Sequence, residues 1–287
     1  MKKIEIIIMS FLSLFLVTGC FKRDTMEGIS IYTTVYPIEY LVESIYGYNS
    51  TVDSIYPNGT DISTYELTNK QQDEYAQTDM FIYNGLTDEK QIAATFLNKN
   101  KDLKIIDVSK GVSLQYDPEE LWLCPSNYLM LAQNIKNELN EYINSTVVRQ
   151  EIESNYDALK LTISTFDAEL KLIAENSTNK TIIAGNDVFN FLEKYGFEVL
   201  SVEENDKYVQ IDYQTARNNI NNDTNSFVFV LDTDPESENV KKLEEAGATV
   251  VYVDSMINLA DEERNDGLDY PKMMESFIEQ IRTEAYN

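Results

Sequence analysis

The chain has 287 residues, of which 49 are Asp or Glu and 23 are Lys or Arg, so its formal net charge is −26 at pH 7. A surface this acidic repels polyanions, which excludes nucleic acid as a partner. The sequence contains no histidine, and it therefore lacks the commonest metal ligand and the commonest general base. Its only two cysteines are Cys20 and Cys124, so no disulfide framework is expected.

The first 19 residues are predicted to form a lipoprotein signal peptide. A short basic start precedes an apolar run that is too short to span a bilayer, which needs roughly 20 residues. The run ends in VTGC (17–20), which resembles the lipobox of bacterial lipoproteins. That resemblance implies cleavage before Cys20 and a diacylglyceryl group on its thiol, with residues 20–28 as the tether. An ordinary cleaved signal, or a short anchor with an incidental cysteine, is the alternative.

The fold is expected to begin near Ile29 with a first α/β lobe that spans residues 29–145. Strand-like runs alternate there with segments of helical spacing, and this alternation implies a parallel sheet. The predicted strands are 29–35, 51–56, 79–83 and 103–108, and the predicted helices are 37–48, 68–77, 86–99 and 126–142.

One long amphipathic helix is predicted for residues 146–176. The stretch from Thr146 to Glu175 has no Gly or Pro, and its apolar residues recur at spacings of three and four. At 1.5 Å per residue such a helix reaches roughly 45 Å. Because the repeat lasts only about three heptads, packing along the chain's own lobes is favoured over a coiled coil with a partner.

The alternation of strands and helices restarts after the long helix and predicts a second α/β lobe, residues 177–287. Its predicted strands are 180–184, 197–202, 226–231 and 249–253, and its predicted helices are 187–195, 209–221, 235–246 and 271–285. The fold class is therefore α/β, with two lobes that each hold a mainly parallel four-stranded sheet flanked by helices, joined by one long rigid helix. Ligands of open α/β sheets bind beyond the carboxyl ends of the strands, so the ligand cleft is expected between the lobes.

Several runs of the sequence resemble, in order, the lipoprotein solute-binding components of ABC importers for zinc and manganese. The resemblance implies a divalent metal ion, manganese or zinc, as the transported ligand, held between the lobes, and an ABC permease with its ATPase subunit as partners. It also implies a location outside the cytoplasm, lipid-anchored to the outer face of the cytoplasmic membrane, and no enzymatic activity; we expect a monomer. The matching runs include YTTVYPIEYLVESIYG (32–47), YPNGTDISTYELTNKQ (56–71), DPEELWLCPSN (117–127) and KKLEEAGATVVYVDS (241–255).

The positions that match the family's metal ligands carry oxygen donors in this chain. In the first lobe, Ser63 stands where the family has His, and Glu120 takes the second ligand position when the spacing to Trp122 is kept. In the second lobe, Asn186 occupies the position three residues before a Phe, and Asp254 is followed by Ser, as in the manganese-type members. Asp187, Cys124 and Glu66 are the alternates.

A set of oxygen donors suits manganese, magnesium or calcium better than zinc. A second hypothesis keeps the fold and the tether but discards the metal: the chain would bind a cationic or tyrosine-stacked organic ligand, or act as a surface interaction protein. A third, enzymatic, hypothesis would use Glu119 and Glu120 as acid and base. It is disfavoured because adjacent side chains point apart and no nucleophile motif is present.

Overall fold

The computed structural model describes residues 26–204, 209–234 and 237–286. The predicted signal peptide, Cys20 and most of the predicted tether lie outside these residues. No helix in the described ranges is long and apolar enough to cross a membrane.

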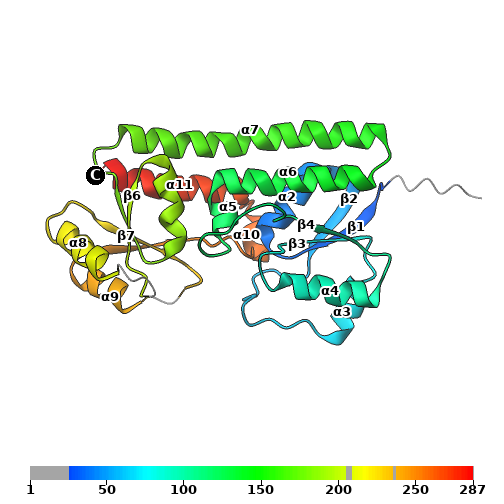
Figure 1. Ribbon diagram of the computed structural model, residues 1–287, viewed down its shortest axis with the longest axis horizontal. Helices are drawn as coiled ribbons and strands as arrows, with labels where there is room; N and C mark the ends of the chain where they lie inside the picture. Colours follow the sequence, from blue (N-terminus) through cyan, green and yellow to red (C-terminus); the bar gives the residue numbers. More distant parts are fainter. Residues whose placement is uncertain (1–25, 205–208, 235–236, 287) are drawn as a thin grey trace, which may run out of the picture.

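The first lobe is a parallel four-stranded sheet covered by helices on both faces (Figure 1). Its strands lie in the order β2-β1-β3-β4 and are β1 (Ile29–Thr33), β2 (Ser50–Ser54), β3 (Met80–Tyr83) and β4 (Lys104–Asp107). Its helices are α2 (Tyr36–Tyr46), the 3-10 turn η1 (Gly47–Asn49), α3 (Asn69–Tyr75), α4 (Glu89–Lys99), α5 (Glu120–Leu123) and α6 (Pro125–Tyr142).

The second lobe repeats this topology, because its strands lie in the order β6-β5-β7-β8 and all pair in parallel. The strands are β5 (Thr181–Ala184), β6 (Glu198–Ser201), β7 (Phe227–Leu231) and β8 (Thr249–Val253). The helices are η2 (Asp187–Tyr195), α8 (Val209–Asn221), α9 (Glu238–Glu245), α10 (Asp261–Asn265) and α11 (Tyr270–Tyr286). The expected fold class is thereby confirmed.

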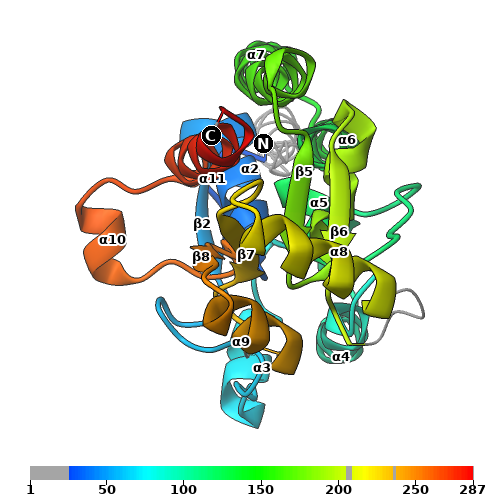
Figure 2. The same ribbon diagram turned by 90° about the vertical axis from the view of Figure 1, so that its left-hand side faces the viewer.

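The long helix α7 (Thr146–Asn176) runs along both lobes (Figure 1), and Figure 2 shows it end-on above α11 and α6. It begins at Ser145, whose side chain accepts a hydrogen bond from the Val148 N–H, as expected of a helix N-cap. Its apolar stripe is buried against α2, α6 and α11, so the chain's own helices cover the face that a coiled-coil partner would need. The buried positions of the stripe are Ile152, Tyr156, Leu159, Ile163, Phe166, Leu170 and Ile173.

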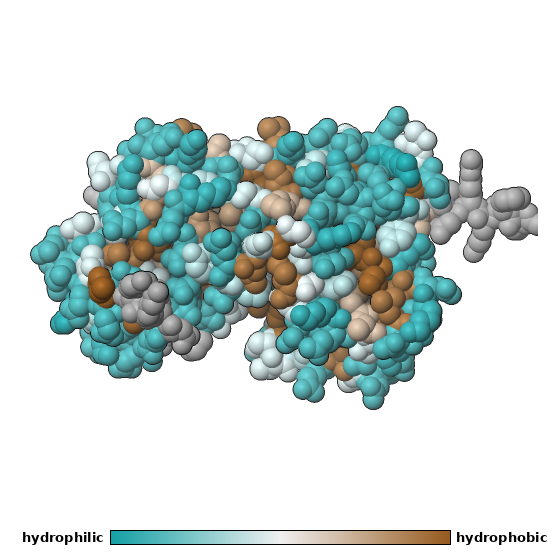
Figure 3. All heavy atoms as spheres, in the orientation of Figure 1, coloured by the Kyte–Doolittle hydropathy of each residue, from teal (hydrophilic) through white to brown (hydrophobic). Residues whose placement is uncertain are grey.

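The two lobes and α7 share one hydrophobic core, which extends from Ile31 of the first sheet to Phe229 of the second. Polar contacts cross between the lobes as well: the Tyr36 N–H donates to the Ile257 carbonyl at 3.0 Å, and Arg264 forms a two-bond ion pair with Glu39 at 2.6 and 2.9 Å. The face shown in Figure 3 is mostly hydrophilic, and hydrophobic residues gather near its middle, where the lobes adjoin.

Most differences between the predicted and observed elements are local. The segment predicted as a helix at 187–195 is the 3-10 helix η2. Two short helices, α5 and α10, were not predicted, because four or five residues are too few to show a 3.6-residue period.

The shared core predicts a sharp contrast between two leucines of α7. Leu170 is fully buried and Leu161 is 72% exposed. We expect Leu170→Ala to lower the free energy of unfolding by about 2–5 kcal/mol, because it leaves a cavity. Leu161→Ala should change it by less than about 0.5 kcal/mol. Urea unfolding measures both, and equal losses would show that α7 is not packed as described.

Candidate functional site

A large open cavity of about 1270 Å³ lies between the lobes. In each sheet the second strand pairs on one side of the first strand, and the third strand pairs on its other side. The strand order therefore reverses direction between β1 and β3 in the first sheet and between β5 and β7 in the second. Crevices form beyond the carboxyl ends of strands at such points. The cavity is lined accordingly by residues that follow strands, including Val35 after β1, Asn84 after β3, Asp232 after β7 and Asp254 after β8.

The cavity is strongly acidic. Among the described residues that line it, none is Lys or Arg. A concave site of one charge sign focuses the electrostatic field, so this cavity attracts cations. The nine lining carboxylates are Asp61, Glu66, Asp88, Glu89, Glu119, Asp232, Asp234, Asp254 and Glu263.

Asp232 of the second lobe contributes to the raised pKa values of two other lining carboxylates, Glu119 of the first lobe and Asp254 of the second. Burial raises the pKa of Glu119 to about 7, and the nearby carboxylates of Asp117, Asp234 and Asp232 add to the rise. Burial is also the main reason that the pKa of Asp254 is raised, and Asp232 adds to it. Each aspartate has one oxygen held by the backbone: Asp232 accepts the Ser255 N–H at 2.9 Å, and Asp254 accepts the Met256 N–H at 2.7 Å. Among the residues that the structure describes, the second oxygen of each aspartate accepts no hydrogen bond from the backbone.

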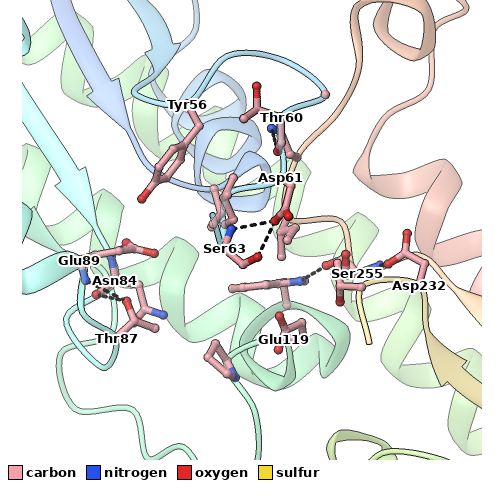
Figure 4. Close-up of a pocket in the computed structure, with 18 of the residues that line it drawn as sticks. Tyr56, Thr60, Asp61, Ser63, Asn84, Thr87, Glu89, Glu119, Asp232 and Ser255 are labelled. Carbon is pink, nitrogen blue, oxygen red and sulfur yellow. Dashed lines mark hydrogen bonds between the residues drawn. The ribbon is translucent and has the colours of Figure 1, made fainter. Parts of the chain in front are cut away.

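A second polar group lies on the opposite side of the cavity (Figure 4). Figure 4 shows Glu89, Asn84 and Thr87 together there, with Ser63 and Glu119 between them and Asp232. The Glu89 carboxylate accepts the Asn84 N–H at 2.7 Å, and burial raises the pKa of Glu89 to about 7.

Ser63, Glu66 and Asp254 are the sequence-predicted residues that line the cavity. The Ser63 hydroxyl donates to Asp61 at 2.6 Å, and the Ser63 N–H donates to the same oxygen at 2.9 Å. These hydrogen bonds lower the pKa of Asp61 and keep it charged. Ser63, which stands where the family has His, therefore orients the carboxylate of Asp61.

Glu120 is not among the residues that line the cavity. Its side chain is buried, and one oxygen accepts the backbone N–H groups of Gln115 and Tyr116, each at 3.1 Å, while the other accepts Asn127 Nδ2 at 3.1 Å. The carboxylate thus fixes the loop that precedes α5. Its neighbour Glu119 faces the cavity instead, because successive residues in a helical turn point about 100° apart.

Asn186 and its alternate Asp187 are also outside the cavity lining. The Asn186 carbonyl oxygen accepts the Leu231 N–H at 2.9 Å, and its amide donates to Asp234 at 2.6 Å. Asn186 thereby ties the end of β5 to the end of β7 and positions Asp234, which does line the cavity. Asp187 accepts the Ser201 hydroxyl at 2.5 Å.

Cys124 lies in the hydrophobic core at 3% exposure. Its sulfur is 3.4 Å from the Ser126 hydroxyl, and it is not a cavity residue. The structure therefore places this thiol away from the cavity carboxylates.

The carboxylates are spread around the cavity and do not form a compact cluster. Within residues 26–204, 209–234 and 237–286, no group of three or more Cys, Asp or Glu side chains is arranged to hold a metal ion. A cation that enters would therefore have to draw the carboxylates closer together.

Glu119 and Asp232 were not among the expected ligands. Asp232 directly follows β7, and its position at a strand end makes it a candidate from the sequence, although a carboxylate shortly before Pro235 fits a helix N-cap equally well. Glu119 differs from the expected Glu120 by one residue, and the sequence around them holds no signal that separates the two.

The repeated α/β lobes, the single long helix and the acidic interlobe cavity define a two-lobed solute-binding protein. Residues 31–284 match the family described as zinc-uptake complex component A, periplasmic, and the chain belongs to that family. The expected resemblance is thereby confirmed.

Individual relatives agree with this assignment. The chain is 28% identical over 220 residues to the iron ABC transporter substrate-binding lipoprotein MtsA of Streptococcus pyogenes serotype M6, covering 68% of this chain and 69% of that protein. Two solved structures share the fold. They are the Zn(II)-bound ZnuA-like domain of Streptococcus pneumoniae AdcA (TM-score 0.71, 18% identity, 91% of this chain and 100% of that one) and the metal-dependent lipoprotein YcdH of Bacillus subtilis (TM-score 0.73, 17% identity, 90% and 100%).

The raised pKa of Glu89 predicts a pH-dependent stability. Its pKa rises from 4.5 to about 7 on folding, so between these pH values the folded state holds a proton that the unfolded state has released. The free energy of unfolding should therefore fall as the pH rises through this window, by up to about 3 kcal/mol.

Glu89→Gln should make this decline shallower, and the remaining slope reflects Glu119, which titrates in the same range. Urea unfolding at a series of pH values, in the presence of a chelator, measures how the free energy of unfolding changes with pH. Glu262→Gln, on the exposed surface of α10, is the matched control and should keep the wild-type profile. A Glu89→Gln profile as steep as the wild type would contradict the burial of this carboxyl group.

Proposed function

We propose that this chain captures a divalent metal ion in the interlobe cavity and delivers it to an ABC permease. The observation that carries the proposal is the set of carboxylates that face one cavity from both lobes, with no Lys or Arg among the described lining residues. Glu119, Asp232 and Asp254 are the proposed ligands. Burial, with a contribution from Asp232, raises the pKa values of Glu119 and Asp254, and a divalent cation bound between these carboxylates offsets the cost of their charge.

The donor chemistry favours a hard cation. Carboxylate oxygens suit manganese, magnesium or calcium, and the residues that would make the site softer are either missing from the sequence or, like Cys124, buried elsewhere. The names of relatives point to zinc or iron. Manganese is consistent with both the oxygen donors of this chain and the divalent cargo of the family.

The proposed setting is the outer face of the cytoplasmic membrane. A lipid on Cys20 would hold the binding protein next to its permease, and an ATPase subunit would supply the energy, with this chain acting as a monomer. The relative MtsA is named a lipoprotein of an ABC transporter, which supports this setting. The alternative is a lipoprotein of the same fold that has lost the metal site, and the spread of the carboxylates is the observation in its favour.

Two adjacent glutamates test the proposed ligand set. Glu119→Gln removes a cavity carboxylate and should weaken Mn²⁺ binding at least tenfold, which is about 1.4 kcal/mol. Glu120→Gln removes a carboxylate of the same size that accepts loop N–H groups. It should lower the stability but leave the affinity of the folded protein unchanged.

Isothermal titration of the metal-stripped protein with Mn²⁺ and Zn²⁺ measures both variants, and circular dichroism confirms that each is folded. A larger loss from Glu120→Gln than from Glu119→Gln would overturn the proposed ligand set. A wild-type protein that binds neither ion would overturn metal capture itself.

A further inference from the structure

The cavity is larger than a bare metal ion requires. Its volume of about 1270 Å³ exceeds the roughly 300–1,000 Å³ of pockets that enclose whole organic molecules. The proposed ligands are three carboxylates, whereas hard divalent cations take six or more donor atoms. An ion held here would therefore keep coordination positions for donors that are not part of this protein.

A smaller side pocket of about 330 Å³ adjoins this cavity and has several aromatic and apolar lining residues. The two pockets have Tyr56, Glu66, Gln91 and Ile92 in common as lining residues, so they lie next to each other. The rings of Tyr56 and Tyr65 lie 5.9 Å apart and nearly perpendicular, at 84°. Phe96 completes a lining that suits a flat aromatic group.

The cavity also contains an unused hydrogen-bond donor. Asn84 is 1% exposed and lines the cavity, and its Nδ2 has no hydrogen-bond partner among the described residues. Its Oδ1 already accepts the Leu86 N–H at 3.0 Å, so the amide orientation is set. A buried donor without a partner is costly, and an acceptor oxygen on a ligand would satisfy it. A metal cation cannot do so.

We propose that the cavity binds the divalent ion together with a small aromatic chelator that carries a carboxylate. The ion lies against the proposed carboxylate ligands, the ring enters the side pocket beside Tyr56 and Tyr65, and an oxygen of the chelator accepts from Asn84. The chelator supplies the metal-coordinating atoms that the chain lacks, including nitrogen donors of the kind that histidine provides in other metal-binding proteins. This inference rests on the proposed capture of a divalent metal ion.

The first experiment compares ligands on the wild-type protein by isothermal titration. The ligands are Zn²⁺ alone, its preformed complex with quinoline-2-carboxylate, and its preformed complex with glycinate, which chelates in the same way but has no ring. Quinoline-3-carboxylate with Zn²⁺ is the control for a ring and a carboxylate that cannot chelate. We expect the quinoline-2-carboxylate complex to bind at least tenfold more tightly than the free ion and than either control.

Two pairs of variants locate the contact. Tyr65→Leu should abolish the tenfold advantage and leave the affinity for free Zn²⁺ unchanged, whereas Tyr75→Leu should keep the advantage. Tyr75 is a matched control because it also forms a tyrosine pair in the first lobe, with Tyr32, away from the cavity.

Asn84→Asp keeps the acceptor oxygen for the Leu86 N–H but replaces the free N–H donor by an oxygen, and it should also abolish the tenfold advantage. Asn98→Asp, on the exposed face of α4, should not.

The outcomes separate this inference from the proposed function. If free Zn²⁺ binds and its quinoline-2-carboxylate complex binds no more tightly, the chelator inference is overturned and metal capture stands. An equal gain from glycinate, or an advantage that survives in folded Tyr65→Leu, likewise overturns it. If the wild type binds neither free Mn²⁺ nor free Zn²⁺, and none of the Zn²⁺ complexes, the proposed function fails, and the chelator inference fails with it.

Discussion

The indole of Trp122 joins the two lobes at the cavity, and the geometry of the site depends on this contact. Its Nε1 donates to the Ser255 carbonyl at 2.8 Å, and the Trp122 carbonyl accepts the Tyr270 hydroxyl at 2.7 Å. Glu119 is three residues before this tryptophan, and Asp254 is next to Ser255. The same packing that holds the lobes together therefore sets the separation of the proposed ligands, and α7 reinforces it by burying one face along both lobes. Such an arrangement favours small adjustments of loops and side chains over a wide hinge motion.

A rigid frame allows the cavity to concentrate negative charge. Four of the carboxylates that face it, Glu89, Glu119, Asp234 and Asp254, are partly buried, and their pKa values are raised because burial and like charges disfavour ionisation. This electrostatic cost is the physical basis of cation binding, since a divalent ion relieves it. The absence of histidine from the sequence then shapes the chemistry, because the remaining donors are oxygens. Affinity is expected to depend on the protonation of Glu119 near neutral pH.

The fold could be predicted from the sequence because its signals are local. The spacing from Ile152 to Ile173 predicted the long helix, and the alternation of apolar runs predicted all eight strands to within a few residues. The site was harder to predict, because its geometry depends on contacts between distant segments. Asn186 matches a ligand position in the sequence, but its amide is engaged with Leu231 and Asp234, which no local motif reveals. Glu119 and Glu120 differ only in which way a short helical turn directs them.

The most direct test of this account is a crystal structure of the protein with Mn²⁺, with data collected at the manganese absorption edge. We expect an anomalous peak in the interlobe cavity, within about 2.1–2.6 Å of carboxylate oxygens from Glu119, Asp232 and Asp254. A cavity without a peak at saturating Mn²⁺, or a peak coordinated by Glu120 and Asn186, would contradict it.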